Sequence, residues 1–367
     1  MSLLDKATII TTPTAHSNGV LHSIKGGSVA DFDVVRGSAA TRVNAEGLIE
    51  DVATNIPRID YTDGTASILL EPQSTNLITY SEDFSQWLKT GTPTITSNYG
   101  VSPNGTQNGT RIEFDADERI RSNFSASGDF TFSVYLKGSG VITLRDNTNV
   151  HRQNVTLTSN WVRYDLSFNA TITSVQIQNQ NAGAVDCEIY GAQVEALPYA
   201  TSYIPTSGAI ATRLADAVAG AGDATTFNST EGVLYAEVAA LADDGETKRL
   251  AISDGGNNNR VFIGYNAANT IQFVIQSSGA IVVNSTFSVS DITQFSKIAI
   301  KYKENDCSFW IDGVKVGTDT TASMPTGLNQ LLFGQGDSSR PLYGKVKSVI
   351  TFDTALTDAE LECLTTI

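Results

Sequence analysis

FWIDGVKV, residues 309–316, is the most informative short sequence in the chain. Asp312 and Gly313 lie between two short apolar runs. A two-residue hairpin turn needs a positive φ at both central positions, and Asp-Gly is one of the pairs that tolerate it. Residues 309–311 and 314–316 are therefore predicted to form a β-hairpin.

Similar apolar runs precede this hairpin and predict the other strands of a C-terminal domain, residues 229–367. The expected strands are 232–241, 249–253, 260–265, 270–276, 280–284 and 297–303. One short helix is expected at the end of the chain, because Thr357 and Glu360 have the spacing of a capping box. Leu361 and Leu364 follow on one face of that helix, which is expected to cover the sheet.

Residues 76–208 contain a second set of predicted strands. FTFSVYLK, residues 130–137, alternates apolar and polar side chains, which is typical of a half-buried strand. Further strands are expected at 110–114, 161–168, 172–177 and 185–193, separated by links rich in Gly, Asn and Ser. This spacing favours a sandwich, and we predict a jelly-roll domain of about eight strands.

Two segments are too poor in apolar residues to form a domain of their own. Residues 1–75 contain only short apolar stretches between turn signals, so we expect an extended arm that needs a partner surface. Residues 209–228 are rich in Ala, Gly, Asp and Thr, and they are expected to form a linker.

The composition favours an all-β protein. The chain has 367 residues, and 24 Lys and Arg oppose 39 Asp and Glu, which gives a formal charge of −15. Only 17% of residues are charged, where about 25% is usual, and Ser, Thr, Asn and Gly take their place. The negative charge disfavours binding to nucleic acid and to anionic membrane surfaces. No apolar run approaches the roughly 18 residues of a membrane helix, and the first residues lack a signal-peptide pattern, so we expect no membrane insertion.

The cysteines and histidines form no recognisable catalytic or metal-binding motif. Cys187, Cys307 and Cys363 are far apart and odd in number, so we expect them to be reduced and buried. Surface or hydrogen-bonding roles are expected for the three histidines, which are His16, His22 and His151.

The carboxylates do not form the pair that glycoside hydrolysis requires. Such a pair stands about 5–10 Å apart, which on one strand needs acids at i, i+2 or i+4. Solvated turn acids are favoured instead for Asp243–Glu246, Glu304–Asp306, Asp353 and Asp358. Asp115–Glu118 is the densest acidic cluster, and an exposed turn is favoured there. We therefore expect no catalytic residues, no metal site and no cofactor, with calcium at Asp115–Glu118 as the one open alternative.

Exposed aromatic rings are candidate platforms for sugars, because the apolar face of a pyranose ring stacks on them. Core or edge packing is favoured for the tryptophans, which are Trp87, Trp161 and Trp310. Tyr99 and Tyr265 each stand beside an asparagine, and both are expected to be exposed. These two tyrosines are the candidate carbohydrate-binding residues.

Three segments resemble parts of bacteriophage virion proteins. LLEPQSTNLITYSEDFSQW, residues 69–87, resembles the opening of carbohydrate-binding-like jelly rolls in phage tail and fibre proteins. YATSYIPT, residues 199–206, together with Thr212 and Arg213, resembles the exit from those modules. DFDVVRGSAATRVN, residues 31–44, is similar to the stretch that precedes them.

The C-terminal region, with its hairpin and its closing segment 344–364, resembles a concanavalin A-like domain of the laminin-G type. Together these resemblances imply an N-terminal extended arm, a jelly-roll sandwich and a concanavalin A-like sandwich. They imply a virion structural protein, a fibre or appendage subunit, whose arm docks on other virion proteins. Its lectin-like domains would meet host-surface polysaccharide. A homotrimer is expected, because strands from several chains can stabilise an arm that has no core.

Two other functions remain as alternatives. One is a head-fibre or capsid decoration protein without a specific ligand, and the other is a polysaccharide depolymerase. An extracellular bacterial lectin is disfavoured by the missing signal-peptide pattern. The expected location is the virion, assembled in the cytoplasm of the host bacterium.

Overall fold

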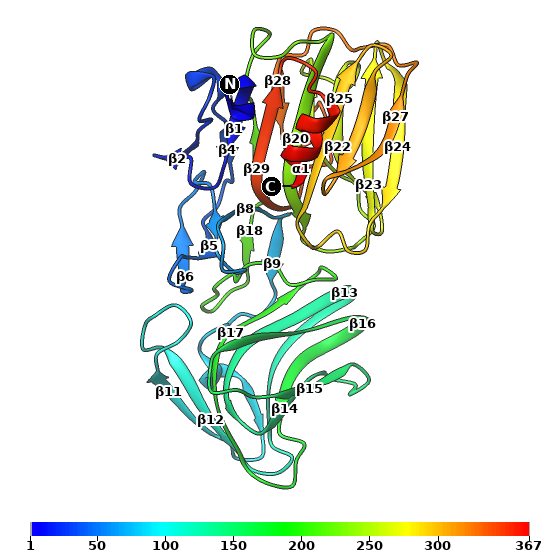
Figure 1. Ribbon diagram of the computed structural model, residues 1–367. Coiled ribbons are helices and arrows are strands. Elements are labelled where there is room, and N and C mark those ends of the chain that lie inside the picture. Colours follow the sequence, from blue (N-terminus) through cyan, green and yellow to red (C-terminus); the bar gives the residue numbers. More distant parts are fainter. Residues whose placement is uncertain (1, 367) are drawn as a thin grey trace. The chain divides into compact units, whose positions relative to one another are not determined.

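The computed structural model describes residues 2–366 and has an all-β fold, as predicted (Figure 1). Its contacts divide the chain into two compact units. Within the described residues, unit 1 comprises 2–37, 54–72 and 215–366, and unit 2 comprises 38–53 and 73–214. The helical segments are short, and they are η1 (Leu3–Lys6), η2 (Gly27–Ala30), η3 (Phe84–Gln86) and α1 (Asp358–Thr366).

Unit 1 contains two main sheets. The larger has the order β27 (Val314–Asp319), β26 (Cys307–Ile311), β25 (Ser296–Lys303), β20 (Glu231–Ala240), β29 (Gly344–Phe352), β8 (Ser67–Leu70) and β7 (Ile59–Asp60), with β1 (Ala7–Thr11) also paired to β29. The smaller has the order β24 (Ala280–Ser288), β23 (Thr270–Ser277), β22 (Arg260–Ala267), β21 (Lys248–Ser253) and β28 (Gln330–Leu332). Two short ladders pair β19 (Ala217–Ala219) with β4 (Asp33–Val35) and β2 (His16–Ser17) with β3 (Val20–Leu21).

Alternating apolar side chains of both sheets form the core of unit 1. Ile300 on β25 and Ile263 on β22 belong to one buried cluster, at 0% and 1% exposure. The predicted hairpin is confirmed, because β26 and β27 pair in antiparallel fashion, and Asp312 and Gly313 have φ values of 47° and 79°. Both positions require a left-handed backbone conformation, which Asp and Gly adopt more readily than most residues, and this explains why Asp-Gly occurs there.

The predicted capping box and helix are also confirmed. The Thr357 backbone N–H donates to Glu360 Oε2 at 2.9 Å, and the Glu360 N–H donates to Thr357 Oγ1 at 3.4 Å. Leu361 and Leu364 of α1 are buried in a cluster with Trp310 on the larger sheet. Cys363 points away from this contact and is exposed, so its predicted burial is wrong, whereas the other two cysteines are buried. No helix within residues 2–366 is long and apolar enough to cross a membrane.

Unit 2 is built on one bent sheet with two short ladders beside it. The sheet has the order β11 (Thr94–Gly100), β12 (Gly109–Phe114), β17 (Val185–Glu195), β13 (Arg119–Ser139), β16 (Val162–Gln178), β14 (Val141–Asp146) and β15 (Arg152–Thr156), with β10 (Leu88–Thr90) also paired to β13. The ladders pair β18 (Ala211–Arg213) with β9 (Ser74–Asn76) and β5 (Ala40–Val43) with β6 (Ile49–Val52).

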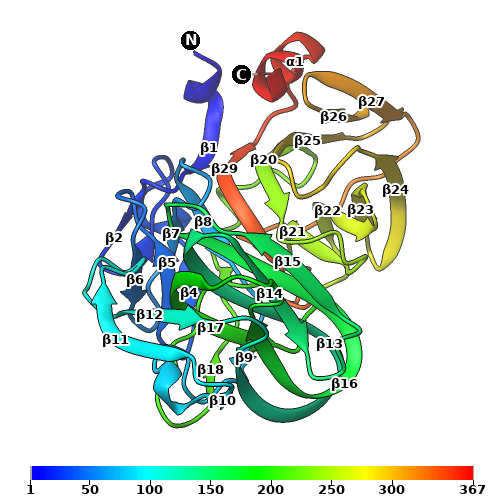
Figure 2. The ribbon, with the colours of Figure 1, turned by 90° about the horizontal axis from the view of Figure 1, so that it is seen from below.

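Two long curved strands, β13 and β16, run through both halves of this sheet (Figure 2). The start of β13 pairs with β10 and with the end of β16, whereas its later part pairs with β17 and with the start of β16. The register shifts between Asn123 and Ala126. Because both strands bend, the two halves enclose one core, which includes Ile120 from one half and Phe132 from the other.

The curvature accounts for one difference from the predicted strands. Residues 161–168 and 172–177 were expected as two strands, but 162–168 and 172–177 both lie within β16. The intervening residues 169–171 pair with 127–129 of β13, so the ladder continues through the bend. The apolar face predicted for 130–137 is buried, since Phe132, Val134 and Leu136 are all 0% exposed. Thr131 and Ser133 on the other face are also 0% exposed, so the prediction of a half-buried strand is wrong there.

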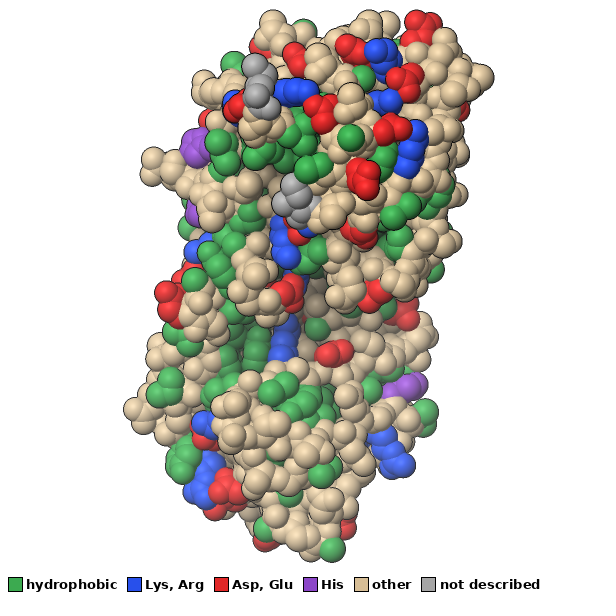
Figure 3. All heavy atoms as spheres, viewed as in Figure 1, with side chains coloured by type: hydrophobic (Ala, Val, Ile, Leu, Met, Phe, Trp, Pro, Cys, Tyr) green, Lys and Arg blue, Asp and Glu red, His purple; other side chains and the backbone are tan. Residues whose placement is uncertain are grey.

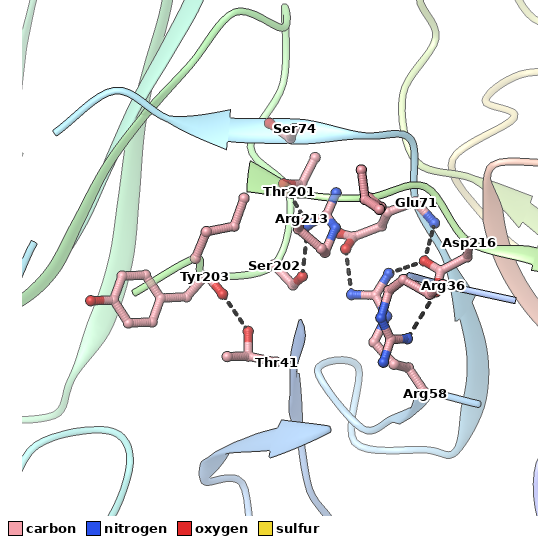
Figure 4. A network of polar contacts seen from close by, with 12 residues as sticks. Arg36, Thr41, Arg58, Glu71, Ser74, Thr201, Ser202, Tyr203, Arg213 and Asp216 are labelled. Atoms are coloured by element: carbon pink, nitrogen blue, oxygen red, sulfur yellow. Dashed lines mark hydrogen bonds and ion pairs between the residues drawn. The ribbon is translucent and has the colours of Figure 1, made fainter. Parts of the chain in front are cut away.

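The structure also divides the N-terminal residues differently from the predicted arm, 1–75. Ile9 on β1 and Ile68 on β8 are buried in the core of unit 1, and both strands pair with β29. Residues 38–53 instead belong to unit 2, where Thr41 Oγ1 donates to the Tyr203 carbonyl at 2.5 Å (Figure 4). Each apolar stretch is too short for a core of its own, but each adds to a core built mainly by distant residues.

The predicted linker, 209–228, and the predicted domain boundaries at 76, 208 and 229 likewise differ from the observed units. Residues 211–213 form β18 in unit 2, and 217–219 form β19 in unit 1. Val218 and Phe227 are 3% and 6% exposed in the core of unit 1. The small residues of this segment allow close packing, so the segment is ordered within both units.

Four buried charged residues of unit 1 form an ion-pair network (Figure 4). The Asp216 carboxylate accepts hydrogen bonds from Arg36 Nη1 at 3.0 Å, from Arg58 Nη2, and from the Glu71 backbone N–H at 2.9 Å. Arg58 Nη1 also donates to Glu71 Oε2 at 2.5 Å. Burial alone would lower the pKa of Arg58, but the charges of Glu71 and Asp216 outweigh it and raise that pKa. The network joins the N-terminal segments of unit 1 to the start of its C-terminal segment.

Candidate functional site

A row of polar side chains crosses four adjacent strands on one face of unit 2. Arg121 on β13 is directly opposite Gln176 on β16. Gln176 is opposite Arg145 on β14, which in turn is opposite Arg152 on β15. Directly opposed residues of an antiparallel pair have their side chains on the same face. One row of the sheet therefore carries three arginines and a glutamine.

A second polar row lies beside the first. Arg119 on β13 is opposite Gln178 on β16, Gln178 is opposite Thr143 on β14, and Thr143 is opposite Asn154 on β15. The two rows are two residues apart along each strand, and residues i and i+2 of a strand share a face. They therefore form one continuous polar surface.

The residues between these rows point into the core, and this alternation fixes the direction of the polar side chains. Ile120, Leu144 and Ile177 are all 0% exposed and belong to the core of unit 2. Because the side-chain period of a strand is two, burying these apolar residues forces their neighbours onto the outer face. The polar surface is thus a direct consequence of the hydrophobic pattern.

A groove of about 540 Å³ lies over this surface. Its volume falls within the range of about 300–1,000 Å³ that is typical of small-molecule sites. Three arginines line it, together with polar uncharged residues and one aromatic ring. The lining residues are Arg119, Arg121, Asn123, Phe124, Arg145, Asn147, Thr173, Ser174 and Gln176.

Two amide side chains in the groove have atoms available for a ligand. Asn147 Oδ1 accepts the backbone N–H groups of Thr173, at 2.8 Å, and Ser174, at 3.4 Å, which leaves the amide nitrogen as a donor. Gln176 is 4% exposed and its Nε2 donates to Ser174 Oγ at 3.4 Å, but its Oε1 has no hydrogen-bond partner among residues 2–366. Buried polar atoms are normally paired, and this oxygen has almost no exposed surface in the structure, so a ligand hydroxyl or a water reaches it only when a neighbouring side chain of the groove moves.

The arginines make the groove positively charged. Arg145 Nη1 donates to Gln178 Oε1 at 2.8 Å, and Arg145 Nε donates to the Asp146 carbonyl at 3.1 Å. Burial lowers the pKa of Arg145, and the neighbouring charge of Arg119 lowers it further. Nε of Arg119 and Nε of Arg121 are buried without a hydrogen-bond partner among residues 2–366. No acidic side chain lines the groove.

On the face drawn in Figure 3, uncharged polar side chains and backbone cover most of the area, and acidic and basic groups are dispersed among them. Two other arginines of unit 2, outside the groove, have carboxylate partners. Arg42 Nε donates to Glu50 Oε1 at 2.6 Å, and Arg111 Nη2 lies 2.6 Å from Asp186 Oδ2.

Tyr99, one of the two tyrosines predicted for sugar binding, lies outside the groove. It is on β11, at the end of the sheet order opposite to β14 and β15, and it is 49% exposed. The Arg111 guanidinium carbon lies 5.1 Å from the centroid of its ring. The ring is therefore exposed as predicted, although Arg111 covers part of it.

Tyr265, the second predicted residue, cannot contact a sugar at the surface. It is 1% exposed in the core of unit 1, and its hydroxyl donates to the Val238 carbonyl at 3.4 Å. Burial raises the pKa of this hydroxyl. Val261, Ile263 and Tyr265 alternate along β22 toward the core, so the predicted exposure of Tyr265 is wrong.

Other residues considered from the sequence have structural roles. Trp87 and Trp310 are both 4% exposed. His151 Nδ1 lies 2.8 Å from Asp146 Oδ2, which fits its expected hydrogen-bonding role. In the acidic cluster, Glu118 is 8% exposed and its Oε2 accepts the Asp115 N–H at 2.9 Å, so this acid is not on an exposed turn. Among residues 2–366, no group of three or more His, Cys, Asp or Glu is arranged to hold a metal ion.

The groove itself was missed by the sequence reasoning. A local signal exists, because residues 119–121, RIR, and 142–145, ITLR, alternate polar and apolar side chains. Such alternation predicts a half-buried strand with a charged outer face. It does not reveal that these two strands both pair with β16 and so bring their arginines together.

Comparisons with known proteins concern parts of the chain. Residues 219–362 match a family model, Laminin_G_3, described as the concanavalin A-like lectin/glucanases superfamily. No curated protein matches the sequence. This region of unit 1 is therefore similar to a concanavalin A-like lectin domain.

Several solved structures share part of the fold at low similarity. A carbohydrate-binding module, CBM40, of the Ruminococcus gnavus IT-sialidase bound to alpha2,3 sialyllactose is 17% identical, covers 39% of this chain and 86% of that chain, and has a TM-score of 0.33. Domain 4 of the extracellular arabinanase AbnA from Geobacillus stearothermophilus, in complex with arabinotriose, is 14% identical and has a TM-score of 0.34. The match covers 46% of this chain and 82% of that chain. A SAP-like pentraxin from Limulus polyphemus is 11% identical, covers 36% and 69%, and has a TM-score of 0.29.

Proposed function

We propose that this protein binds glycans without catalysing their cleavage, and that the groove of unit 2 is its binding site. The observation that carries the proposal is the set of polar atoms that converge there. Gln176 Oε1 is an unpaired acceptor, and the Asn147 amide nitrogen and the guanidinium groups are donors. A sugar hydroxyl both donates and accepts hydrogen bonds, so it can use both kinds of group.

Two further features support glycan binding. Phe124 contributes an aromatic ring to an otherwise polar lining, and the apolar face of a pyranose ring packs well on such a ring. The match of residues 219–362 to a concanavalin A-like lectin family supports a lectin-like role for unit 1 as well. Two binding units in one chain would raise the avidity for a repetitive polysaccharide.

Binding rather than hydrolysis is favoured by the chemistry of the groove. Glycoside hydrolysis generally uses two carboxyl groups that flank the scissile bond. The residues that line the groove include neither Asp nor Glu. A depolymerase would require its acids elsewhere, and release of reducing ends from a bound polysaccharide would favour that alternative.

The finer proposal is a phage virion fibre or appendage subunit that recognises host-surface polysaccharide. The resemblance of residues 31–44, 69–87 and 199–206 to phage virion proteins supports it. The proposal includes a homotrimer, docking of the N-terminal residues on other virion proteins, and no resident cofactor. Labelling the protein on intact particles tests its location, and light scattering of the purified chain tests the trimer. A particle-bound protein that binds no glycan would favour the alternative, a decoration protein of the capsid or head fibre.

A glycan array probed with the full chain tests the binding function. Gln176→Leu removes the unpaired amide oxygen without leaving a large cavity, and we expect it to weaken binding to the best array members. Arg42→Gln is the matched control, because this arginine lies in unit 2 but pairs with Glu50 outside the groove lining. Equal binding by Gln176→Leu and the native chain would contradict the groove as the site.

Tyr99 is a second proposed sugar contact, on the strength of its exposed ring. Tyr99→Ala on the same array tests it separately, because β11 and β14 lie at different ends of the sheet order. Unchanged binding by Tyr99→Ala would remove this residue from the proposal and leave the groove unaffected.

A further inference from the structure

The arginines of the groove lie close together, although their positive charges repel one another. Arg145 of the groove is directly opposed to Arg152, which is on the neighbouring strand but outside the groove lining. Arg121 is two strands from Arg145, which corresponds to about 10 Å, and Arg119 is two residues from Arg121, which corresponds to about 7 Å. Like charges that are directly opposed on a sheet destabilise it. This arrangement therefore calls for a counter-charge.

The protein does not supply that counter-charge within the groove. The chain carries 39 acidic residues against 24 basic ones, yet none of the acids lines this groove. The two unpaired Nε atoms, on Arg119 and Arg121, are buried donors. The pKa of Arg145 is lowered by burial, by Arg119 and by Arg152, and the charge of Asp146, which raises it, does not offset this lowering. Such a shift is expected where cations crowd.

We propose that the groove selects acidic glycans, and that Arg119, Arg121 and Arg145 bind the anionic substituent of the sugar. This inference rests on the proposed glycan-binding function. A guanidinium can donate two parallel hydrogen bonds to a carboxylate, a sulfate or a phosphate, and charge-assisted bonds of this kind are roughly twice as strong as neutral ones. Gln176 and Asn147, beside the arginines, are placed to bind the hydroxyls of the same sugar.

An acidic glycan fits these observations better than a nucleic acid does. A formal charge of −15 repels a long polyphosphate backbone over the whole molecule, whereas one acidic sugar meets only the local positive charge. Single-stranded nucleic acids are usually held by several aromatic rings on which successive bases stack. The groove has a single aromatic ring, Phe124, among polar side chains.

The test uses the full chain on an array of sialylated, uronate-containing, sulfated, phosphorylated and neutral glycans. We expect the best-bound members to be acidic. Their binding should fall at least about tenfold when the carboxylates are methyl-esterified, because charge-assisted hydrogen bonds are lost. The carboxylated, sulfated and phosphorylated members distinguish the kinds of anion. Tighter binding to an oligothymidylate than to any glycan would overturn the inference.

Charge-neutralising variants connect the preference to the groove. The double variant Arg119→Gln and Arg145→Gln should lose at least about tenfold in affinity for acidic members and change much less for neutral ones. The double variant Arg119→Lys and Arg145→Lys should recover part of this loss, since lysine keeps the charge but not the planar fork. Arg42→Gln, the matched control, should change acidic binding less than about twofold.

The outcomes separate the two proposals. If glycans bind but the neutral members are preferred, or if the Arg119 and Arg145 double variant binds acidic members as the native chain does, the selectivity is wrong and the glycan-binding function stands. If no glycan of either kind binds, the glycan-binding function itself is contradicted. Circular dichroism and the thermal midpoint of each variant show whether a loss of binding reflects unfolding.

Discussion

The buried network around Asp216 should be essential for the stability of unit 1. Asp216→Asn removes one negative charge from a site where all four partners are at most 4% exposed. The carboxylate accepts from Arg36 Nη1, Arg58 Nη2 and the Glu71 N–H, and an amide has only one oxygen with which to replace two. After the change, the network would carry one negative charge fewer beside its two buried guanidinium groups.

The expected magnitude follows from this burial. Removing one partner of a buried ion pair costs about 3–5 kcal/mol, because the remaining charge is uncompensated. For a unit of this size, 1 kcal/mol corresponds to about 2–4 °C in the thermal midpoint, so the expected fall is about 6–20 °C. Scanning calorimetry of the full chain measures this shift.

Asp63→Asn is the matched control in the same unit. Asp63 Oδ2 lies 2.5 Å from Lys345 Nζ, but its side chain is 48% exposed. Exposed pairs contribute about 0–1 kcal/mol, so the thermal midpoint of this variant should fall by no more than about 4 °C. A shift for Asp216→Asn no larger than that of Asp63→Asn would refute the assigned role of the network.

Four further predictions concern unit 1. Native protein should react with one equivalent of a thiol reagent, at Cys363, and with three after unfolding; two or three in the native state would contradict the burial of the other cysteines. Thr357→Ala should lower the free energy of unfolding by about 0.5–2 kcal/mol in urea titrations, through loss of the N-cap, and no change would argue against the capping box. A hydrogen bond from Lys6, together with bonds from Thr357, lowers the pKa of Glu360 to about 2. The contribution of Glu360 to the free energy of unfolding is therefore present above pH 4.5 and lost as the pH falls toward 2. Glu360→Gln should lower the free energy of unfolding at pH 7 and differ little from the native chain at pH 2. An equal loss at both pH values would contradict the lowered pKa of Glu360. Tyr265→Phe should leave glycan binding unchanged, since this ring is in the core; weaker binding by the folded variant would contradict that placement.

Local sequence signals predicted those elements whose partners are close in the chain. The hairpin at 309–316 and the capping box at 357–360 each depend on residues a few positions apart, and both are present. The alternation at 130–137 also placed its apolar side chains correctly. The exposure of Tyr265 was misjudged because it stands beside Asn266 at the end of the predicted strand 260–265, although Val261 and Ile263 already had the alternation of a buried face.

Pairings between distant residues could not be predicted from these signals. Ile10 of β1 lies opposite Ile350 of β29, so the short apolar stretches near the N-terminus complete a sheet whose other strands come from the far end of the chain. The groove has the same origin. Arg121 and Arg145 are each on the outer face of a locally recognisable strand, but they meet only because β16 lies between β13 and β14.

A crystal structure of the full chain with the acidic oligosaccharide that binds best on the array tests the central claim most directly. The account predicts that the ligand lies in the groove, with its anionic group within about 3 Å of a guanidinium nitrogen of Arg119, Arg121 or Arg145. It also predicts a ligand hydroxyl within hydrogen-bond distance of Gln176 Oε1. A ligand bound outside this groove, beside Tyr99 or on unit 1 alone, would contradict the account.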